Sequence, residues 1–169
     1  IGSHEENTKA ELEEMLRQLQ PESMMTVLKL LPHIQDPDLY SRFRRVLLHH
    51  AETDPRPLVQ MARQGSLPVR QAAILILGLI SKSDMVPIIL EAAGSEAPAL
   101  RKTAVKALTR HHPPLYDHLL AFMRDPDPEI RRVISNFLLR DANPSGGGHP
   151  QKTLNTPSAI LGYLGRQSF

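Results

Sequence analysis

The sequence predicts an all-α protein, an α-solenoid of about four stacked two-helix repeats with an N-terminal capping helix and a C-terminal tail. Apolar helical segments recur about every 30 residues, and the segments agree on which of their positions are apolar. The composition fits this fold, because the 169 residues include 41% hydrophobic and 22% charged side chains and no cysteine. The chain therefore has the apolar residues that a core needs, and it has no thiol for a disulfide, a thiolate metal site or a cysteine nucleophile.

The first helix is expected from residue 7 or 8 to Gln20. Thr8 and Glu11 have the spacing of a capping box, and leucine and methionine follow at helical intervals. The glutamates of this helix give it a charged outer side, which the open end of a stacked array requires. Residues 1–4 resemble the remnant of an affinity tag and are left out of the fold, so the solenoid is expected over residues 5–141.

Four prolines mark the register of the repeats, each just before an apolar segment. Pro37, Pro68, Pro98 and Pro128 are separated by 31, 30 and 30 residues. Each following segment contributes to four apolar columns at offsets of 0, 4, 7 and 8, which share one face of an α-helix. The columns are Leu39, Val69, Leu100 and Ile130; Phe43, Ala73, Ala104 and Ile134; Val46, Ile76, Ala107 and Phe137; and Leu47, Leu77, Leu108 and Leu138. We expect these segments to be the second helices of the repeats.

Shorter helices are expected between these segments, at residues 23–34, 55–63, 84–93 and 114–124. A proline or a capping residue stands near the start of each, where a missing backbone N–H costs little. Each repeat is then a pair of antiparallel helices joined by a turn. One such pair cannot bury its apolar face alone, so neighbouring pairs must stack and share a continuous core.

The second helices begin with similar sequences at residues 67–73, 99–104 and 128–132. These segments resemble the second helix of HEAT repeats, and more closely the short bacterial kind found in phycobilisome-lyase-like proteins; the resemblance covers residues 23–140. It departs from the family in its period, which is shorter than the roughly 40 to 47 residues of HEAT arrays, and in Tyr40, which stands where the later repeats have arginine. The resemblance implies a right-handed solenoid whose second helices line the concave side, and it implies no particular chemistry.

The character of the chain changes after the last repeat. Residues 142–155 form a linker rich in glycine and proline that we expect to be flexible, and residues 156–169 contain a short apolar segment. A helix this short is marginal in water by itself. We therefore expect its apolar side chains to dock on this solenoid or on a neighbour's, with a disordered terminus as the alternative. The docking residues are Ile160, Leu161, Tyr163 and Leu164.

Three further columns are expected on the concave side: Ser41, Gln71, Lys102 and Arg132; Arg45, Leu75, Lys106 and Asn136; and Leu48, Gly78, Thr109 and Leu139. They predict a groove with an apolar centre at Ile74, Leu75 and Gly78 and a basic end. Such a groove suits an extended or helical peptide with apolar anchors and some acidic residues; a merely solvated face is the alternative. The candidate binding residues are Arg45, Gln71, Leu75, Lys102, Lys106, Arg132 and Asn136.

No motif in the sequence indicates catalysis, a cofactor or a metal. There is no serine elbow motif and no phosphate-binding loop. The adjacent pairs His49–His50 and His111–His112 do not suit chelation, since neighbouring residues on a helix point about 100° apart. Acidic residues at the turns are expected to cap helices. A ladder of arginines is expected to bond to carbonyls or to a turn aspartate in a neighbouring repeat, with the capture of an acidic ligand as the alternative: Arg70, Arg101 and Arg131.

The leading hypothesis is a non-enzymatic scaffold that binds a peptide or helix of a protein partner, or its own tail, on the concave face. One alternative is an enzyme or subunit of the phycobilin-lyase kind, acting on a tetrapyrrole attached to a partner. Nucleic-acid binding is less favoured, because the chain has no Trp and a net charge of only +2. No apolar run reaches the roughly 18 residues of a membrane span. We expect a cytoplasmic protein or a soluble domain of a larger one.

Overall fold

The computed structural model describes Glu11, Glu14, Met15 and Gln18 and residues 21–80, 82–113 and 115–142. Within these residues the chain is helical and contains no β-strand. The α-helices are α2 (Pro21–Leu30), α3 (Pro37–Thr53), α4 (Arg56–Gln64), α5 (Leu67–Ile80), α6 (Val86–Ala93), α7 (Pro98–Leu108), α8 (Tyr116–Ala121) and α9 (Pro128–Ala142). Short 3-10 turns extend or precede three of them: η1 (Leu31–His33), η2 (Ser83–Met85) and η3 (Phe122–Arg124).

Two predicted parts of the chain fall mostly or wholly outside the described residues. Of the N-terminal capping helix, Glu11, Glu14 and Met15 are described and are helical. The C-terminal docking segment with Ile160, Leu161, Tyr163 and Leu164, and the linker before it from residue 143 on, are not described. The predictions made for them stay predictions.

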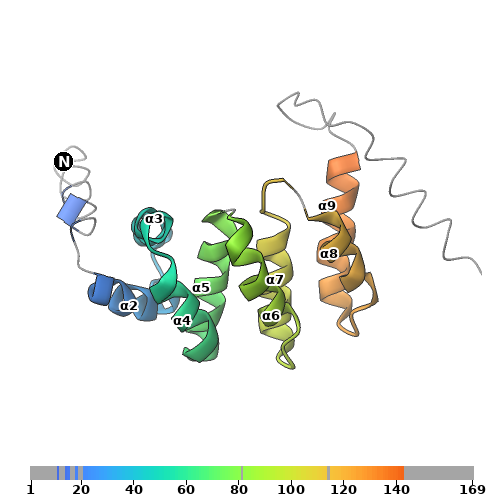
Figure 1. Cartoon of the computed structure of the whole chain (residues 1–169), viewed down its shortest axis with the longest axis horizontal. Helices are drawn as coiled ribbons and strands as arrows, with labels where there is room; N and C mark the ends of the chain where they lie inside the picture. Colours follow the sequence, from blue (N-terminus) through green and yellow to red (C-terminus); the bar gives the residue numbers. More distant parts are fainter. Residues whose placement is uncertain are drawn as a thin grey trace, which may run out of the picture.

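The described helices form a series of hairpins, α2–α3, α4–α5, α6–α7 and α8–α9, that follow one another along the long axis of the molecule (Figure 1). This confirms the predicted all-α solenoid. Proline and a capping aspartate set the start of α3, because Asp36 Oδ1 accepts hydrogen bonds from the backbone nitrogens of Asp38 at 2.8 Å and Leu39 at 3.1 Å. The predicted capping role of a turn acid is confirmed there.

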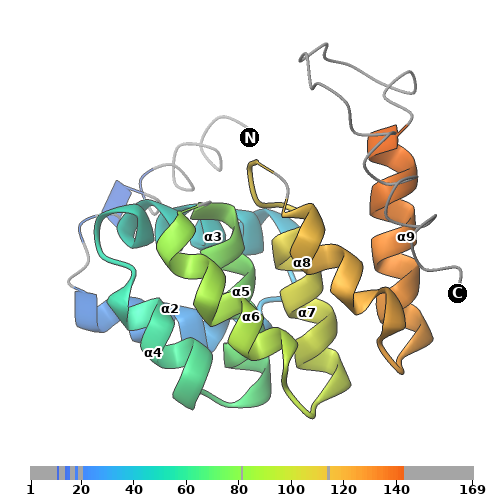
Figure 2. The same cartoon turned by 45° about the vertical axis from the view of Figure 1, so that its right-hand side comes forward.

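The second helices form a continuous row. Helix α5 packs against α3 on one side and α7 on the other, and α7 packs against α9. The first helices form another layer, in which α4 lies against both α2 and α6 while packing on its own partner α5 (Figure 2). In Figure 1, α3 is seen end-on whereas α5, α7 and α9 are seen from the side, so the first member of the row is turned relative to the others.

The core runs through the layer between the two rows. Leu47, Leu77 and Leu108 are fully buried, as their shared column predicts. Leu138 of the same column is half-buried, because no further hairpin of the described chain packs beyond α9. Each leucine removed completely from water contributes about 1.5–3 kcal/mol to stability. Among the helices of the described residues, none combines the length and apolarity needed to cross a membrane.

Candidate functional site

One side of the second helices is open to solvent, and we call it the second-helix face. On each helix it consists of three residues spaced by four, which turn only about 40° per step and so stay on one side. The twelve residues are Ser41, Arg45 and His49 of α3; Gln71, Leu75 and Leu79 of α5; Lys102, Lys106 and Arg110 of α7 and the turn after it; and Arg132, Asn136 and Arg140 of α9. All seven candidate binding residues predicted from the sequence lie on this face.

The apolar part of the second-helix face differs from the prediction. Ile74 and Gly78, expected at the centre of a groove, are buried between α5 and α7, so this part of the prediction is wrong. A Cβ at Gly78 would lie 2.6 Å from the Cβ of Ala107 and 2.9 Å from its Cα. The glycine therefore allows two neighbouring helices to approach closely and has no role at the surface. The apolar residues that do lie on the face are Leu75 and Leu79, both half-buried.

Gln71 also faces the next repeat. Its Nε2 donates to the carbonyl oxygen of Ala99 at 3.1 Å and to Oγ1 of Thr103 at 3.0 Å. The Thr103 hydroxyl in turn donates to the same carbonyl at 2.8 Å. Gln71 thus joins α5 to α7 at the border of the second-helix face, where its amide is already hydrogen-bonded within the fold.

The α7 and α9 part of the face is basic and contains one paired carboxylate. Oε2 of Glu129 accepts from Nζ of Lys102 at 3.1 Å and from Nη2 of Arg132 at 2.7 Å. The hydrogen bond from Lys102, together with the nearby Arg132 charge, holds the pKa of Glu129 below its ordinary value. Lys106 and Asn136 are exposed beside this group, and Arg45 on α3 is exposed as well.

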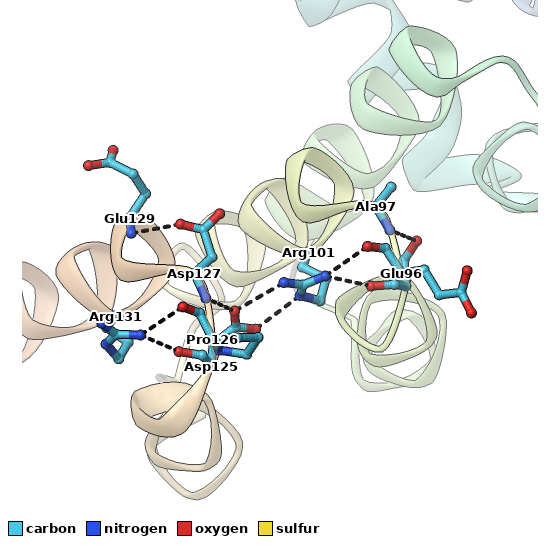
Figure 3. A network of polar contacts seen from close by, with 9 residues as sticks. Glu96, Ala97, Arg101, Asp125, Pro126, Asp127, Glu129 and Arg131 are labelled. Carbon is cyan, nitrogen blue, oxygen red and sulfur yellow. Dashed lines mark hydrogen bonds and ion pairs between the residues drawn. The ribbon is translucent and has the colours of Figure 1, made fainter.

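The arginine ladder is part of the structural framework. Arg101 forms a bidentate ion pair with Asp125 of the next hairpin, with Nε–Oδ2 at 3.0 Å and Nη2–Oδ1 at 3.2 Å (Figure 3). Its Nη1 also donates to the carbonyl oxygens of Ser95 at 3.1 Å and Glu96 at 3.0 Å. The Arg101 guanidinium holds the pKa of the buried Asp125 carboxyl below its usual value.

The other two arginines donate to backbone carbonyl oxygens of their own hairpins. Nη1 of Arg131 donates to the carbonyl oxygens of Asp125 at 2.6 Å and Pro126 at 3.0 Å (Figure 3). Nε of Arg70 donates to the carbonyl oxygen of Ala62 at 3.0 Å. Arg70 and Arg131 therefore bond to carbonyls of their own hairpins, whereas Arg101 bonds to the turn aspartate of the neighbouring repeat. The structural interpretation of the ladder is confirmed, and of the three arginines Arg101 is the one that links two repeats.

The turn before α9 shows why acids gather there. Oδ1 of Asp125 accepts from the backbone N–H of Asp127 at 2.8 Å, and Oδ1 of Asp127 accepts from that of Glu129 at 2.8 Å. Asp127 thus stands in the position of an N-cap for α9 (Figure 3). The two acids serve the turn and the helix start.

The histidines remain dispersed. The rings of His49 and His50 lie 5.8 Å apart in an edge-to-face arrangement. His111 is buried, with Nδ1 at 3.0 Å from the carbonyl oxygen of Pro113, while its Nε2 is buried without a hydrogen-bond partner. Within the described ranges, no three histidine, aspartate or glutamate side chains come close enough together to hold a metal ion.

Two shallow hollows lie near the first-helix layer, and the sequence analysis did not predict them. One, of about 350 Å³, is lined by Pro55, Arg56, Val59, Gln60, Arg63, Gln64 and Met85. The other, of about 440 Å³, is lined by Lys29, His33, Met61, Gln64, Gly65, Ser66 and Val69. Both arginines of the first hollow are engaged in ion pairs, Arg56 with Asp54 at 2.8 Å and Arg63 with Glu91 at 3.0 Å.

The family is decided by the hairpins that follow α3. A family model described as HEAT repeats matches residues 55–139, which is half of the chain. The chain belongs to the HEAT-repeat family. No curated protein matches it. The match starts at the N-terminus of α4 and thus leaves out the first hairpin, in which Tyr40 replaces the arginine of the later HEAT repeats.

The matched HEAT repeats contain most of the second-helix face, including all of its residues on α5 and α7. The closer likeness to phycobilisome-lyase-like proteins stays a prediction. HEAT repeats commonly mediate protein–protein interactions. The arginine ladder and the second-helix face are distinct features of the same helices: the arginines bond to groups within the fold, and the second-helix face meets solvent.

Proposed function

We propose that this HEAT-repeat protein is a non-enzymatic interaction scaffold that binds a peptide or a single helix of a protein partner on its second-helix face. The observation that carries the proposal is that the half-buried Leu75 and Leu79 lie on α5, the helix that packs against α7 with its exposed Lys106. An apolar strip beside a charged border is the usual composition of a peptide-binding surface. A catalytic role is less favoured because the polar groups of the arginine ladder and of the turn acids are already bonded within the fold.

The two leucines suit apolar anchors of a bound segment. They are four residues apart on α5 and therefore about 6 Å apart along the helix axis. Their aliphatic side chains can each remove part of a partner side chain from water, and apolar burial contributes about 25 cal/mol per Å². The face extends over the four second helices α3, α5, α7 and α9, which is enough length for a short peptide.

The C-terminal segment of the chain itself is the second occupant to consider. Ile160, Leu161 and Leu164 would supply anchors for Leu75 and Leu79, and Tyr163 an aromatic ring. The only charged residues after position 141 are Lys152 and Arg166, which are basic like the face. Because like charges repel, we favour another molecule as the occupant and treat the tail as a competing outcome. The second-helix face has no Trp, Tyr or Phe on which bases would stack, and nothing in the described residues favours the tetrapyrrole-lyase alternative.

The test is to select binders from a display library of random peptides with the full chain, and then to measure their Kd for pairs of variants. Leu75→Gln and Lys106→Ala change the second-helix face. Leu90→Gln on α6 and Lys29→Ala on α2 are the matched controls, since Leu90 is also a half-buried leucine and Lys29 is also an exposed lysine.

We expect the face variants to raise the Kd of the selected peptides roughly tenfold, as the loss of one well-placed anchor does at an interface. The control variants should leave Kd unchanged, and circular dichroism should show that all four variants are folded. Peptides that bind the face variants as tightly as the parent chain would show that another surface is the binding site.

A further inference from the structure

The basic residues of the second-helix face form two parallel ladders, which we call the double ladder. One ladder is Lys102, Lys106 and Arg110 on α7 and the turn after it, and the other is Arg132, Asn136 and Arg140 on α9. Five of its six residues are basic. The two helices pack against each other, and Lys102 and Arg132 share the carboxylate of Glu129, so the ladders lie side by side.

The double ladder has more positive than negative charge. Glu129 pairs with Lys102 and Arg132, which are the first residues of the two ladders. Lys106, Arg110 and Arg140 are exposed, and in the part of the chain that the structure describes their charged groups have no ion-pair partner.

Asp141, which follows Arg140 in the sequence, is engaged elsewhere. Asp141 accepts a hydrogen bond from the hydroxyl of Tyr116 on α8. Burial of the Tyr116 ring, together with this hydrogen bond, raises the pKa of its hydroxyl to about 12. Asp141 is therefore directed toward α8.

This arrangement has a cost to the fold. Like charges four residues apart on a helix repel each other, and Lys102 and Lys106 have that spacing on α7, with Arg110 following in the next turn. A bound anion would relieve the repulsion and gain attraction to several cations at once. The charge pattern therefore indicates a ligand that carries several negative groups.

The neighbouring part of the face distinguishes a protein from a nucleic acid. Leu75 and Leu79 on α5 have the same register in their repeat as Lys106 and Arg110 have in the next. Because α5 packs against α7, the helix with the two leucines lies beside the helix with the first basic ladder. A charged phosphate backbone gains no favourable contact from leucine side chains. The twelve residues of the face also include no Trp, Tyr or Phe on which bases would stack. An acidic peptide with apolar residues uses both halves.

Resting on the proposed function, we propose that the occupant of the second-helix face is an acidic segment of a partner protein. Its apolar residues lie on Leu75 and Leu79, and its carboxylates pair with Lys106, Arg110 and Arg140. Adjacent helices are about 8–10 Å apart and an extended chain advances about 3.3 Å per residue, so one helix-to-helix step takes about three residues. A segment that crosses from α5 over α7 to α9 therefore carries its acids at intervals of about three residues after an apolar anchor.

The experiment uses the full chain and synthetic peptides with a fluorescent label. The first peptide has two leucines followed by glutamates at every third position; in the second and third, glutamine or lysine replaces each glutamate. Binding is measured by fluorescence anisotropy at low and high salt, with a labelled DNA duplex and a peptide of residues 156–169 as competitors. Lys106→Glu is compared with Lys29→Glu, the same change at an exposed lysine on α2.

We expect the glutamate peptide to bind roughly tenfold more tightly than the glutamine peptide, with a Kd that rises with salt because the ion pairs are exposed. Lys106→Glu should weaken the glutamate peptide and strengthen the lysine peptide, while Lys29→Glu changes neither. A reversal of preference of this kind requires the charge at residue 106 to lie within a Debye length, roughly 10 Å, of the peptide charges.

The outcomes separate this inference from the proposed function. If library peptides bind and lose affinity on Leu75→Gln but show no preference for acids, the acidic partner is excluded while the scaffold function stands. Tighter binding of the duplex, or of the peptide of residues 156–169, than of the glutamate peptide overturns the inference in favour of a nucleic acid or of the chain's own tail. If no library peptide responds to any change on the face, the proposed function itself fails.

Discussion

At Gly78 the absence of a side chain sets the distance between α5 and α7. A methyl group there would meet the Cβ and backbone of Ala107 at less than 3 Å, and the backbone of α7 cannot move aside as a flexible side chain would. We predict that Gly78→Ala lowers the free energy of unfolding by about 1–3 kcal/mol, the range for overpacking a well-filled core.

Gly94 supplies the matched control for that prediction. It ends α6 at φ −86°, and a Cβ there would meet its nearest neighbours at 3.6 and 3.8 Å, which is ordinary contact. Gly94→Ala should therefore be neutral or stabilise the fold by up to about 1 kcal/mol, through reduced freedom of the unfolded chain. Urea unfolding of both variants is the measurement; equal stability of the two would contradict the close approach of α5 and α7.

The ion pair between Arg101 and Asp125 leads to a second prediction at the residue scale. Only 14% of the Arg101 side chain and 5% of the Asp125 side chain are exposed. Arg101→Met removes the bidentate partner and leaves a largely buried carboxylate, which we expect to lower the free energy of unfolding by about 2–3 kcal/mol. Arg56→Met is the control, because Arg56 is 87% exposed in its pair with Asp54 and such pairs contribute little.

The same pair makes stability depend on pH in a direction that can be checked. The Arg101 guanidinium lowers the pKa of Asp125 in the folded state. A lowered folded pKa gives stability that is fully present above the unfolded pKa and is lost as the pH falls through the folded value. The parent chain should therefore lose stability on acidification below about pH 4, and Arg101→Met should show a flatter dependence over the same range. A parallel loss in both proteins would mean that other carboxylates dominate.

At the scale of the helix, the sequence was sufficient to predict the order and buried side of the described repeats. The four apolar columns fall on buried or half-buried positions because each repeat faces its own first helix in the same way. The flanks of the second helices were harder to assign. Ile74 and Gly78 lie on one flank of α5, and a helical wheel does not show whether this flank is buried or exposed. In the fold both residues are buried, and α7 packs against α5. For the same reason the sequence analysis did not include the exposed Arg110 and Arg140 among the face residues. It assigned the third position of the face to Thr109 and Leu139, one residue earlier.

Two leucines of α5 separated by one residue test this assignment. Leu77 is fully buried and Leu79 is half-buried on the second-helix face. Leu77→Asp places an unpaired charge in the core and should abolish cooperative folding, whereas Leu79→Asp should keep the helical content and lose only a few degrees of Tm. Far-ultraviolet circular dichroism and thermal unfolding compare the two. A Leu77→Asp variant that melts like the parent would disprove the predicted core.

For the whole molecule, stacking of hairpins means that each one is stabilised chiefly by its neighbours. Because the open surface depends on contacts between hairpins, the second-helix face could be located from the sequence only in part. The repeats specify their own hairpins locally, but the surface that remains open depends on how two hairpins meet, as at Gln71 and Gly78. The charge pattern of the double ladder likewise becomes apparent only once α7 and α9 are known to lie next to each other.

Nearest-neighbour stabilisation also predicts an uneven distribution of local stability. Helices α5 and α7 have a second helix on both sides, whereas α9 has one described neighbour in the row and exposes 66% of Leu139. Leu39 and Phe43 of α3 are only half-buried as well. Amide hydrogen exchange followed by mass spectrometry should therefore show the slowest exchange in α5 and α7 and at least roughly tenfold faster exchange in α3 and α9. Uniform exchange across the four helices would mean that the protein unfolds as one cooperative unit, in which case packing between repeats is stronger than the local exposure indicates.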